Sequence, residues 1–167
     1  YPSELVETID WQGRALTLRP IRPEDEAQHL EFLSRLEPID IRMRVFYSRR
    51  SIERSELARL TQIDYDREIA LLAVAPGPRG LEETLGVVRA LCDPDREAAE
   101  FGILVRSDLK GQGLGGLLMR TMIAALQAQG VQRLVASVLK ENTGMIGLMR
   151  KMGFRIVAQA EDPLVFD

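Results

Sequence analysis

The 167-residue sequence contains a single cysteine, Cys92, and a single histidine, His29. One cysteine excludes an internal disulfide, and one cysteine with one histidine excludes a zinc cluster of Cys and His ligands. The sequence therefore predicts no metal site, and its cysteine usage is typical of the reducing cytoplasm. No histidine neighbours Cys92 in the sequence, so we expect an inert thiol there, not a nucleophile.

Long apolar runs and an excess of positive charge are also absent. No uninterrupted apolar segment approaches the roughly 18 residues that a membrane-spanning helix needs, and the first residues lack a basic-then-apolar signal pattern. Acidic residues outnumber basic ones by 25 to 22, which gives a formal charge of −3. This balance argues against nucleic-acid binding driven by phosphate neutralisation. We therefore expect a cytoplasmic protein that binds neither membranes nor nucleic acids.

Apolar residues, in contrast, are plentiful. They make up 46% of the chain, which is enough for a substantial core in one domain of ordinary size, roughly 100–150 residues. The sequence begins with Tyr1 and not with methionine. We expect residues 1–167 to be a single domain cut from a longer chain.

Periodicity along the chain predicts a mixed α/β architecture. Alternation predicts a strand over 15–19, and the spacing of Leu30, Leu33 and Leu36 predicts a helix whose positive first turn carries acidic residues 24–26. Further strands are expected over 68–74, 85–91, 99–105, 131–139 and 154–159, and further helices over 51–60, 114–129 and 142–152. The resulting order, β, α, α, β, β, β, α, β, α, β, favours a mixed sheet with helices on its faces.

The stretch VRSDLKGQGLGGLLM, residues 105–119, places four glycines directly before an apolar-faced helix. In such a loop, successive backbone N–H groups and the positive end of the helix dipole converge on one place, which favours an anion. Glycine lets phosphates approach the backbone closely and tolerates positive φ. The alternative is a tight turn with close helix packing. Gly115 and Gly116 each lower the stability of a helix by about 1 kcal/mol relative to alanine. This loss favours the interpretation that the glycines bind an anion.

The type of phosphate ligand is narrowed by what surrounds the glycines. The pattern GxxxxGK[ST] is missing, which excludes a Walker-type loop. Gly111, Gly113 and Gly116 fit GxGxxG, and Glu141 could imitate a ribose-binding acid. However, the polar segment 106–110 separates the strand from the first glycine, and the chain lacks the further βαβ units of a dinucleotide fold. A dinucleotide site is therefore disfavoured.

The glycine stretch resembles the acetyl-CoA pyrophosphate loop of the GNAT acetyltransferases, with Lys110 at its basic position and Gly113 and Gly115 at its last two positions. A second segment, ENTGMIGLMRKMGF (141–154), is similar to the family's Asn-led helix that ends in Gly-Phe. Two such marks in order, each after a strand, are more specific than one glycine loop. The stretches LRPIRPEDEAQHLEFLSRL, RMRVFYSRR and ELARLTQIDYDREIALLAV look like the acetyltransferase domain of Pat-type bacterial protein lysine acetyltransferases.

The resemblance implies a GNAT fold, with a mixed, mostly antiparallel central sheet flanked by helices, and acetyl-CoA as cosubstrate. It implies acetylation of a lysine ε-amine on a protein, with metabolic enzymes such as acyl-CoA or acetyl-CoA synthetases as the expected class. It also implies an attached acyl-CoA-synthetase-like domain in the longer chain. The cofactor-binding residues it implies are Ile103, Leu104, Val105, Lys110, Gly111, Gln112, Gly113, Leu114, Gly115, Gly116 and Asn142.

Acetylation of lysine requires a base. A free lysine has a pKa near 10.4, so forming the neutral amine at pH 7 costs about 4–5 kcal/mol. In Pat-like proteins a glutamate on the strand before the cofactor loop is the base, and the matching residue is Glu100. We expect a half-buried carboxylate that takes the proton directly or through water; the alternative is a glutamate that only faces solvent. Backbone groups of 103–105 are expected to pair with the pantetheine arm and to polarise the thioester carbonyl.

The resemblance identifies no general acid, because Met149 stands where many GNAT enzymes have the tyrosine that protonates the departing thiolate. Thiols titrate near 8.5, so coenzyme A can leave without this help. Two other functions stay open. One is a small-molecule N-acetyltransferase for a polyamine, an antibiotic amine or an amino acid, and the other is an acetyl-CoA-sensing module without catalysis.

Four further features have two interpretations each. Asn142 either contacts the cofactor or only caps its helix. Tyr65 either lines an acceptor groove or belongs to a turn, and His29 is expected to pack or to face solvent. Four arginines interleaved with aromatic residues either grip a protein substrate or the CoA 3′-phosphate, or form a solvated helix face: Arg42, Arg44, Arg49 and Arg50.

Overall fold

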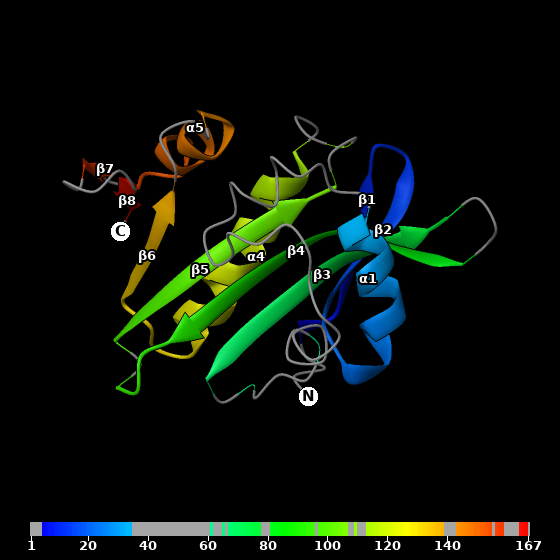
Figure 1. Cartoon of the computed structure of the whole chain (residues 1–167), viewed down its shortest axis with the longest axis horizontal. Coiled ribbons are helices and arrows are strands. Elements are labelled where there is room, and N and C mark those ends of the chain that lie inside the picture. The colour runs from blue at the N-terminus through cyan, green and yellow to red at the C-terminus, as the bar shows by residue number, and fades with distance from the viewer. Residues whose placement is uncertain are drawn as a thin grey trace.

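The computed structural model describes residues 5–34, 61, 65, 67–77, 81–95, 97–106, 109, 113–138, 143–154, 156–158 and 164–166. Its elements are β1 (Glu7–Trp11), β2 (Arg14–Pro20), the 3₁₀ helix η2 (Pro23–Asp25), α1 (Glu26–Ser34), β3 (Glu68–Pro76), β4 (Glu82–Cys92), β5 (Ala98–Val105), α4 (Leu114–Ala128), β6 (Arg133–Val138), α5 (Thr143–Lys151), β7 (Ile156–Ala158) and β8 (Leu164–Phe166). Figure 1 shows their arrangement.

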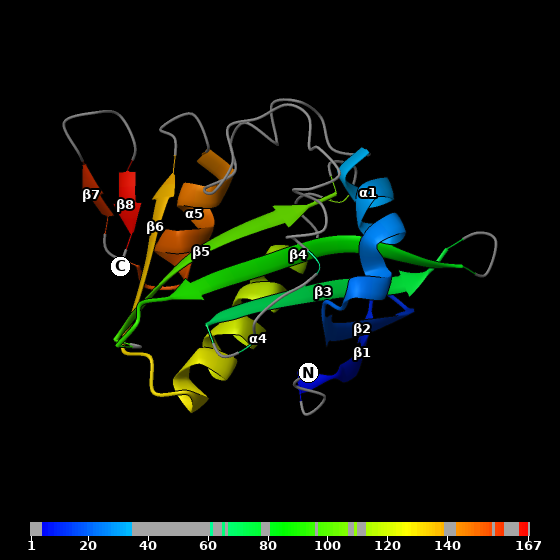
Figure 2. The same cartoon turned by 60° about the horizontal axis from the view of Figure 1, so that its bottom comes forward.

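The described strands form a twisted sheet in the order β1-β2-β3-β4-β5-β6-β8-β7. Every neighbouring pair is antiparallel except β5 and β6, which run parallel. Helix α1 lies on one face of the sheet and α4 on the other (Figure 2). The predicted fold class, a mixed and mostly antiparallel sheet flanked by helices, is confirmed.

The larger core lies between the sheet and α4. The helix sequence is apolar at the spacing of one helical face, and Leu114, Leu118 and Met122 are fully buried there. They pack on alternate residues of the central strands, which include Phe101 and Val88. Every second residue of these strands thus packs on the apolar face of α4, whose residues recur with the 3.6-residue period of a helix.

A smaller core lies beneath α1 on the opposite face. Phe32 and Leu33 of α1 pack there on the sheet residues Leu72, Val87 and Leu104. The predicted face of this helix was partly wrong, because Leu30 is 49% exposed. The helix begins at Glu26 after a separate 3₁₀ turn, and this turn sets which side of α1 meets the sheet.

Most of the predicted helices and strands are confirmed, but the strands near the two ends of the chain were predicted incompletely. The sequence patterns missed β1, which forms a hairpin with β2, and they missed β8, which follows β7 and pairs between β7 and β6. The last predicted strand, 154–159, corresponds to β7 (Ile156–Ala158), and β8 follows it. The predicted helix over 51–60 lies outside the described residues. In the described part of the chain, no helix is long and apolar enough to cross a membrane.

A buried ion pair fixes the start of α1. Arg19 on β2 donates two hydrogen bonds of 2.7 Å to the two carboxylate oxygens of Asp25, and a third to Glu82 on β4. Asp25 also accepts the backbone N–H of Arg22. Burial by itself lowers the pKa of Arg19, but the hydrogen bonds and charges of the two acids outweigh it and raise that pKa above its ordinary value. Asp25, predicted as a simple helix-dipole charge, is therefore a buried ion-pair partner.

Candidate active site

The two parallel strands of the sheet separate along their length. β5 pairs with β6 only over Ala98–Glu100, opposite Arg133–Val135. Beyond this point β5 continues to Val105 with β4 as its partner, while β6 turns to pair with β8. Figures 1 and 2 show the two strands diverging. In the described part of the chain, the edge of β5 from 101 to 105 therefore has no strand paired on its β6 side.

The direction of the backbone groups along this edge follows from their partners. The carbonyl of Ala98 and the N–H of Arg106 bond toward β4, whereas the carbonyl of Glu97 accepts N–H groups at the start of β6. Successive residues of a strand direct their N–H and C=O groups to alternate edges. The backbone groups of Phe101, Ile103 and Val105 therefore face the side from which β6 has separated, and those of Leu104 face β4.

This alternation refines the predicted cofactor segment 103–105. Ile103 and Val105 present backbone groups that an extended ligand could pair with, and Phe101 adds a third such position. Leu104 does not, because its backbone is directed to β4 and its side chain is buried under α1. The sequence does not state the register of the strands, so it could not predict which residues of β5 direct their backbone groups to the free edge.

The glycine stretch ends at the N-terminus of α4, beside the end of β5. Gly113 is the N-cap residue, with φ of +85° and no side chain to bond the first N–H groups of the helix. A Cβ on Gly113 would have no heavy atom within 4 Å, so its backbone conformation, and not lack of room, favours glycine here. The first helical N–H groups thus have no side-chain cap, which is the arrangement that an anion-binding helix terminus needs.

The next three predicted residues lie in the first turn of α4. Leu114 is buried in the larger core, so only its backbone could contact a ligand. A Cβ on Gly115 would lie 3.4 Å from Leu148 of α5 and 3.8 Å from Ile103, and one on Gly116 would lie 3.3 Å from the flexible end of Arg120. The distances at Gly115 are ordinary van der Waals contacts, so close packing alone does not account for glycine at this helical position.

Several predicted binding residues lie outside the described residues. They are Lys110, Gly111, Gln112 and Asn142, together with Glu141 and the four arginines 42, 44, 49 and 50.

Glu100 is the last residue of β5 that pairs with β6, and it lies opposite Val135. Neighbours in the strand, Ala99 and Phe101, are buried against α4, so the Glu100 side chain projects from the face that carries α1. The prediction of a half-buried carboxylate was wrong, because Glu100 is exposed. In the described part of the chain its carboxylate has no hydrogen-bond or ion-pair partner. A carboxylate in this state can accept a proton from a bound amine.

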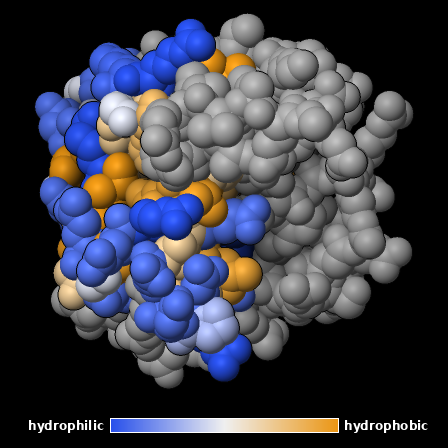
Figure 3. Space-filling view, turned by 90° about the vertical axis from the view of Figure 1, so that its left-hand side faces the viewer, coloured by the Kyte–Doolittle hydropathy of each residue, from blue (hydrophilic) through white to orange (hydrophobic). Residues whose placement is uncertain are grey.

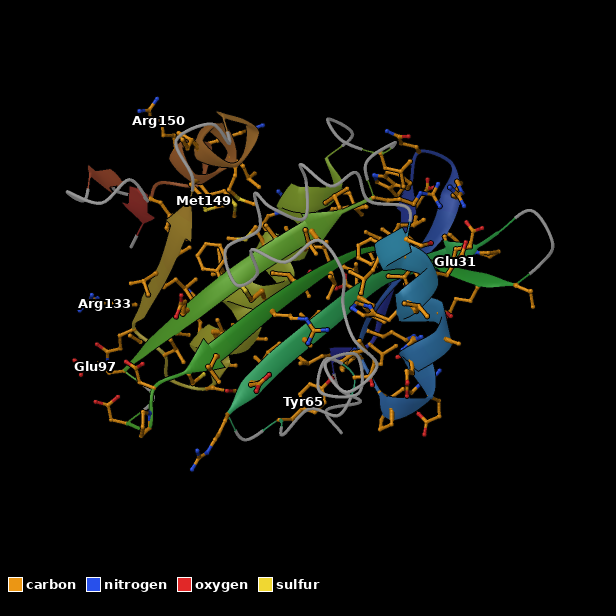
Figure 4. The ribbon with its side chains drawn as sticks, in the orientation of Figure 1. Glu31, Tyr65, Glu97, Arg133, Met149 and Arg150 are labelled. Carbon is orange, nitrogen blue, oxygen red and sulfur yellow. The ribbon has the colours of Figure 1, made fainter. Side chains whose placement is uncertain are left out.

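Met149, the residue in place of the family tyrosine, is fully buried in the larger core. It lies on α5 (Figure 4), and the N–H of Phe154 bonds to its carbonyl where the helix ends. The thioether is therefore a packing group at this position.

Three other candidates, Tyr65, His29 and Cys92, lie in the described part of the chain. The Tyr65 hydroxyl donates to the carbonyl of Ile21 and lies 3.3 Å from the carbonyl of Ala70, so it ties the end of β2 to β3. His29 is fully buried, as a packing histidine, with Nε2 3.3 Å from Nη2 of Arg89. Cys92 is partly buried at the end of β4.

A hollow of about 800 Å³ lies away from these residues, at the C-terminal end of α4. Its lining comes from α4, the start of β6 and the end of α5: Ile123, Leu126, Gln127, Val131, Gln132, Arg133, Leu134, Met152, Gly153 and Phe154. Figure 3 shows apolar patches between hydrophilic side chains on this side of the molecule. None of the predicted site residues lines it. Among the described residues, no group of three or more His, Cys, Asp or Glu could hold a metal ion.

Comparison with known protein families identifies the family of this chain. Residues 15–155 match the family of acetyltransferase (GNAT) domains. The chain belongs to the GNAT acetyltransferase family. It is a GNAT-type, acetyl-CoA-dependent N-acetyltransferase, and the predicted resemblance is confirmed. Family membership also favours an enzyme over a sensing module.

Curated relatives of this GNAT domain are acetyltransferases by name, and the name of one of them states its substrate. An acetyltransferase of Pseudomonas aeruginosa is 28% identical over 149 residues, which are 89% of this chain and 79% of the relative. Acetyltransferase Pat of Mycolicibacterium smegmatis is 31% identical over 157 residues, 89% of this chain and 42% of the relative. An L-methionine sulfoximine/L-methionine sulfone acetyltransferase of Pseudomonas aeruginosa is 39% identical over 64 residues, 38% of this chain and 37% of that protein.

Among solved structures, the GNAT domain of PAT from S. lividans is similar over 99% of this chain and 97% of its own, with a TM-score of 0.86 and 23% identity. This likeness shows the fold. The chain spans less than half of the Pat relative from Mycolicibacterium smegmatis.

Proposed function

We propose that this GNAT domain transfers the acetyl group of acetyl-CoA to the ε-amine of a lysine on a protein, with Glu100 as the general base. The observation that carries the proposal is the position of Glu100. Its exposed, unpartnered carboxylate stands at the last point where β5 and β6 pair, directly before the edge whose backbone groups are free to receive an extended ligand. Base and ligand edge thus adjoin on one strand.

The chemistry follows from this placement. Backbone groups of Phe101, Ile103 and Val105 would hold the pantetheine arm as an added strand, and the first turn of α4 from Gly113 would face its phosphates. Glu100 would remove the proton that prevents a lysine amine from attacking the thioester carbonyl carbon. The coenzyme A thiolate leaves without a side-chain acid, because its conjugate thiol titrates near 8.5 and Met149 is buried in the core.

Lysine on a protein is the acceptor we propose because the N-terminal half resembles Pat-type enzymes and because Pat of Mycolicibacterium smegmatis is among the relatives. The proposed substrate class is metabolic enzymes such as AMP-forming acetyl-CoA synthetases. We also propose that a synthetase-like domain is attached to this GNAT domain, and that the protein works in the cytoplasm.

The test is intact-protein mass spectrometry of a bacterial AMP-forming acetyl-CoA synthetase incubated with acetyl-CoA and this domain. We expect the wild type to add an acetyl group, and Glu100→Gln to lower kcat by about 10²- to 10⁴-fold while acetyl-CoA affinity stays the same. Glu97→Gln is the matched control, because Glu97 is exposed three residues earlier, at the corner where β5 and β6 begin (Figure 4). Full turnover by Glu100→Gln would remove the base from the mechanism.

A second candidate is acetylation of a small amine. The 39% identity with a methionine sulfoximine acetyltransferase over 64 residues supports it. Turnover of free amino acids or polyamines at rates above that of the synthetase would favour this candidate over a protein substrate.

A further inference from the structure

Glu100 belongs to a row of side chains that crosses three strands. Glu68 on β3 lies opposite Leu91 on β4, and Leu91 lies opposite Glu100 on β5. Residues directly opposite each other in a ladder point to the same face. Strands are spaced about 4.8 Å apart, so the two glutamates stand about 10 Å apart with the leucine between them.

The residues of this row are more exposed than residues that serve only to stabilise the fold. Leu91 is 47% exposed in the centre of its row, Glu100 is exposed, and Glu68 is half-buried. In the part of the chain that the structure describes, neither carboxylate has a hydrogen-bond or ion-pair partner. The leucine thus contributes little to the core, and the acids contribute no ion pair to the fold.

The neighbouring row, toward α1, has the opposite charge. Ala70, Arg89 and Gly102 lie opposite one another there, and Arg89 is buried with one guanidinium nitrogen 3.3 Å from His29 Nε2. Arginine stays charged in proteins and can only donate, so Nε2 of His29 is the acceptor in this contact. Arg89 therefore borders the acidic row on its inner side, and the carboxylates of Glu68 and Glu100 are what favours a bound cation over the outer row.

We propose that Glu68 and Leu91 bind the acceptor: its ammonium group lies between the carboxylates of Glu68 and Glu100, and its methylene stem packs on Leu91. This rests on the proposed role of Glu100. The chemistry selects a primary amine on a straight apolar stem, as in lysine. It disfavours an amine with a carboxylate on the neighbouring carbon, because that carboxylate would face two like charges. The row therefore favours a lysine side chain over the α-amine of a free amino acid.

The first test measures steady-state acetylation of the synthetase at saturating acetyl-CoA. We expect Glu68→Gln to raise the acceptor KM about two- to fivefold, the range of an exposed ion pair, with kcat and the acetyl-CoA KM within about twofold of wild type. Glu7→Gln is the matched control, since Glu7 is an exposed strand glutamate on β1 at the far edge of the sheet.

The second test uses peptides that carry lysine, ornithine or 2,4-diaminobutyrate at the modified position. Each methylene that packs on Leu91 should contribute about fourfold in kcat/KM, so the wild type should prefer the longer stem. We expect Leu91→Asn to abolish this preference, and Leu81→Asn, which changes a leucine 71% exposed ahead of β4, to retain it.

The outcomes separate the two proposals. If the wild type acetylates lysine and neither variant alters acceptor KM or stem preference, the acceptor row is wrong and the lysine function stands. If the wild type acetylates no lysine in protein or peptide while binding acetyl-CoA, both proposals fail. A preference for free amino acids over lysine would also overturn the row.

Discussion

Arg19 and Asp25 form a two-pronged ion pair, with both oxygen–nitrogen distances at 2.7 Å and both side chains at most 7% exposed. The pair joins the end of β2 to the turn that begins α1, and Glu82 extends it to β4. Helix α1 covers the smaller core on the face from which Glu100 projects. The position of α1 relative to the proposed acceptor row therefore depends on this pair.

Asp25→Ala should lower the free energy of unfolding by about 3–5 kcal/mol, because it leaves the buried Arg19 cation without its main partner. Urea unfolding followed by circular dichroism measures this. Glu24→Ala is the matched control: its side chain is 75% exposed, and we expect a change within about 0.5 kcal/mol. Equal effects of the two substitutions would mean that the pair contributes no more than surface charge.

The central strands and α4 could be predicted from the sequence because the apolar residues of each are numerous enough to show its pattern. The strands β3, β4 and β5 are mostly apolar in their central residues, and α4 begins after glycines and ends before Gly130, whose φ is +85°. β1 is largely exposed and has only two alternating apolar residues, Ile9 and Trp11, which is too short a pattern to predict a strand. β8 is only three residues long, and its place depends on pairing with distant strands.

The sequence predicted those parts of the candidate site that belong to sequence motifs. The resemblance located Glu100 and the glycine stretch, and the match of residues 15–155 confirms the family. Glu68 and Leu91 were missed because their relation to Glu100 exists only in the register of three strands, with a bulge between Ala73 and Val74. Which residues of β5 face β6 is likewise a matter of pairing that the sequence does not state.

Leu33→Ala should cost about 2–5 kcal/mol of unfolding free energy, because Leu33 is 6% exposed and packs in the smaller core. Leu30→Ala should change it by less than about 0.5 kcal/mol, because Leu30 faces solvent. Both leucines were expected on one buried face. Thermal or urea unfolding of the two variants separates the predicted helix face from the observed one, and a large loss in Leu30→Ala would restore the predicted face.

Met149→Tyr should not create a general acid. The residue is fully buried in the larger core, and a bulkier side chain there should lower stability by about 1–3 kcal/mol without raising kcat. Met149→Leu, close in volume, should cost less than about 1.5 kcal/mol and leave kcat unchanged. Turnover measured at several pH values would reveal a new acid as a rise in kcat for the tyrosine variant, which would place position 149 at the thioester after all.

Gly113→Ala and Gly130→Ala form a matched pair at the two ends of α4. Both glycines have φ of +85°, and a Cβ on either would meet no heavy atom within 4 Å. Each alanine should therefore lower stability by a similar amount, about 1–2 kcal/mol, through backbone strain alone.

The pair should differ in ligand binding, because only Gly113 lies beside the N–H groups proposed to face the phosphates. We expect Gly113→Ala to weaken acetyl-CoA binding about tenfold, or about 1.4 kcal/mol, and Gly130→Ala to leave the affinity as in the wild type. Isothermal titration calorimetry with acetyl-CoA, below the unfolding temperature of both variants, measures the difference. Equal affinities would show that Gly113 serves only the fold of the turn, and the phosphate contacts would then have to come from other residues of the loop.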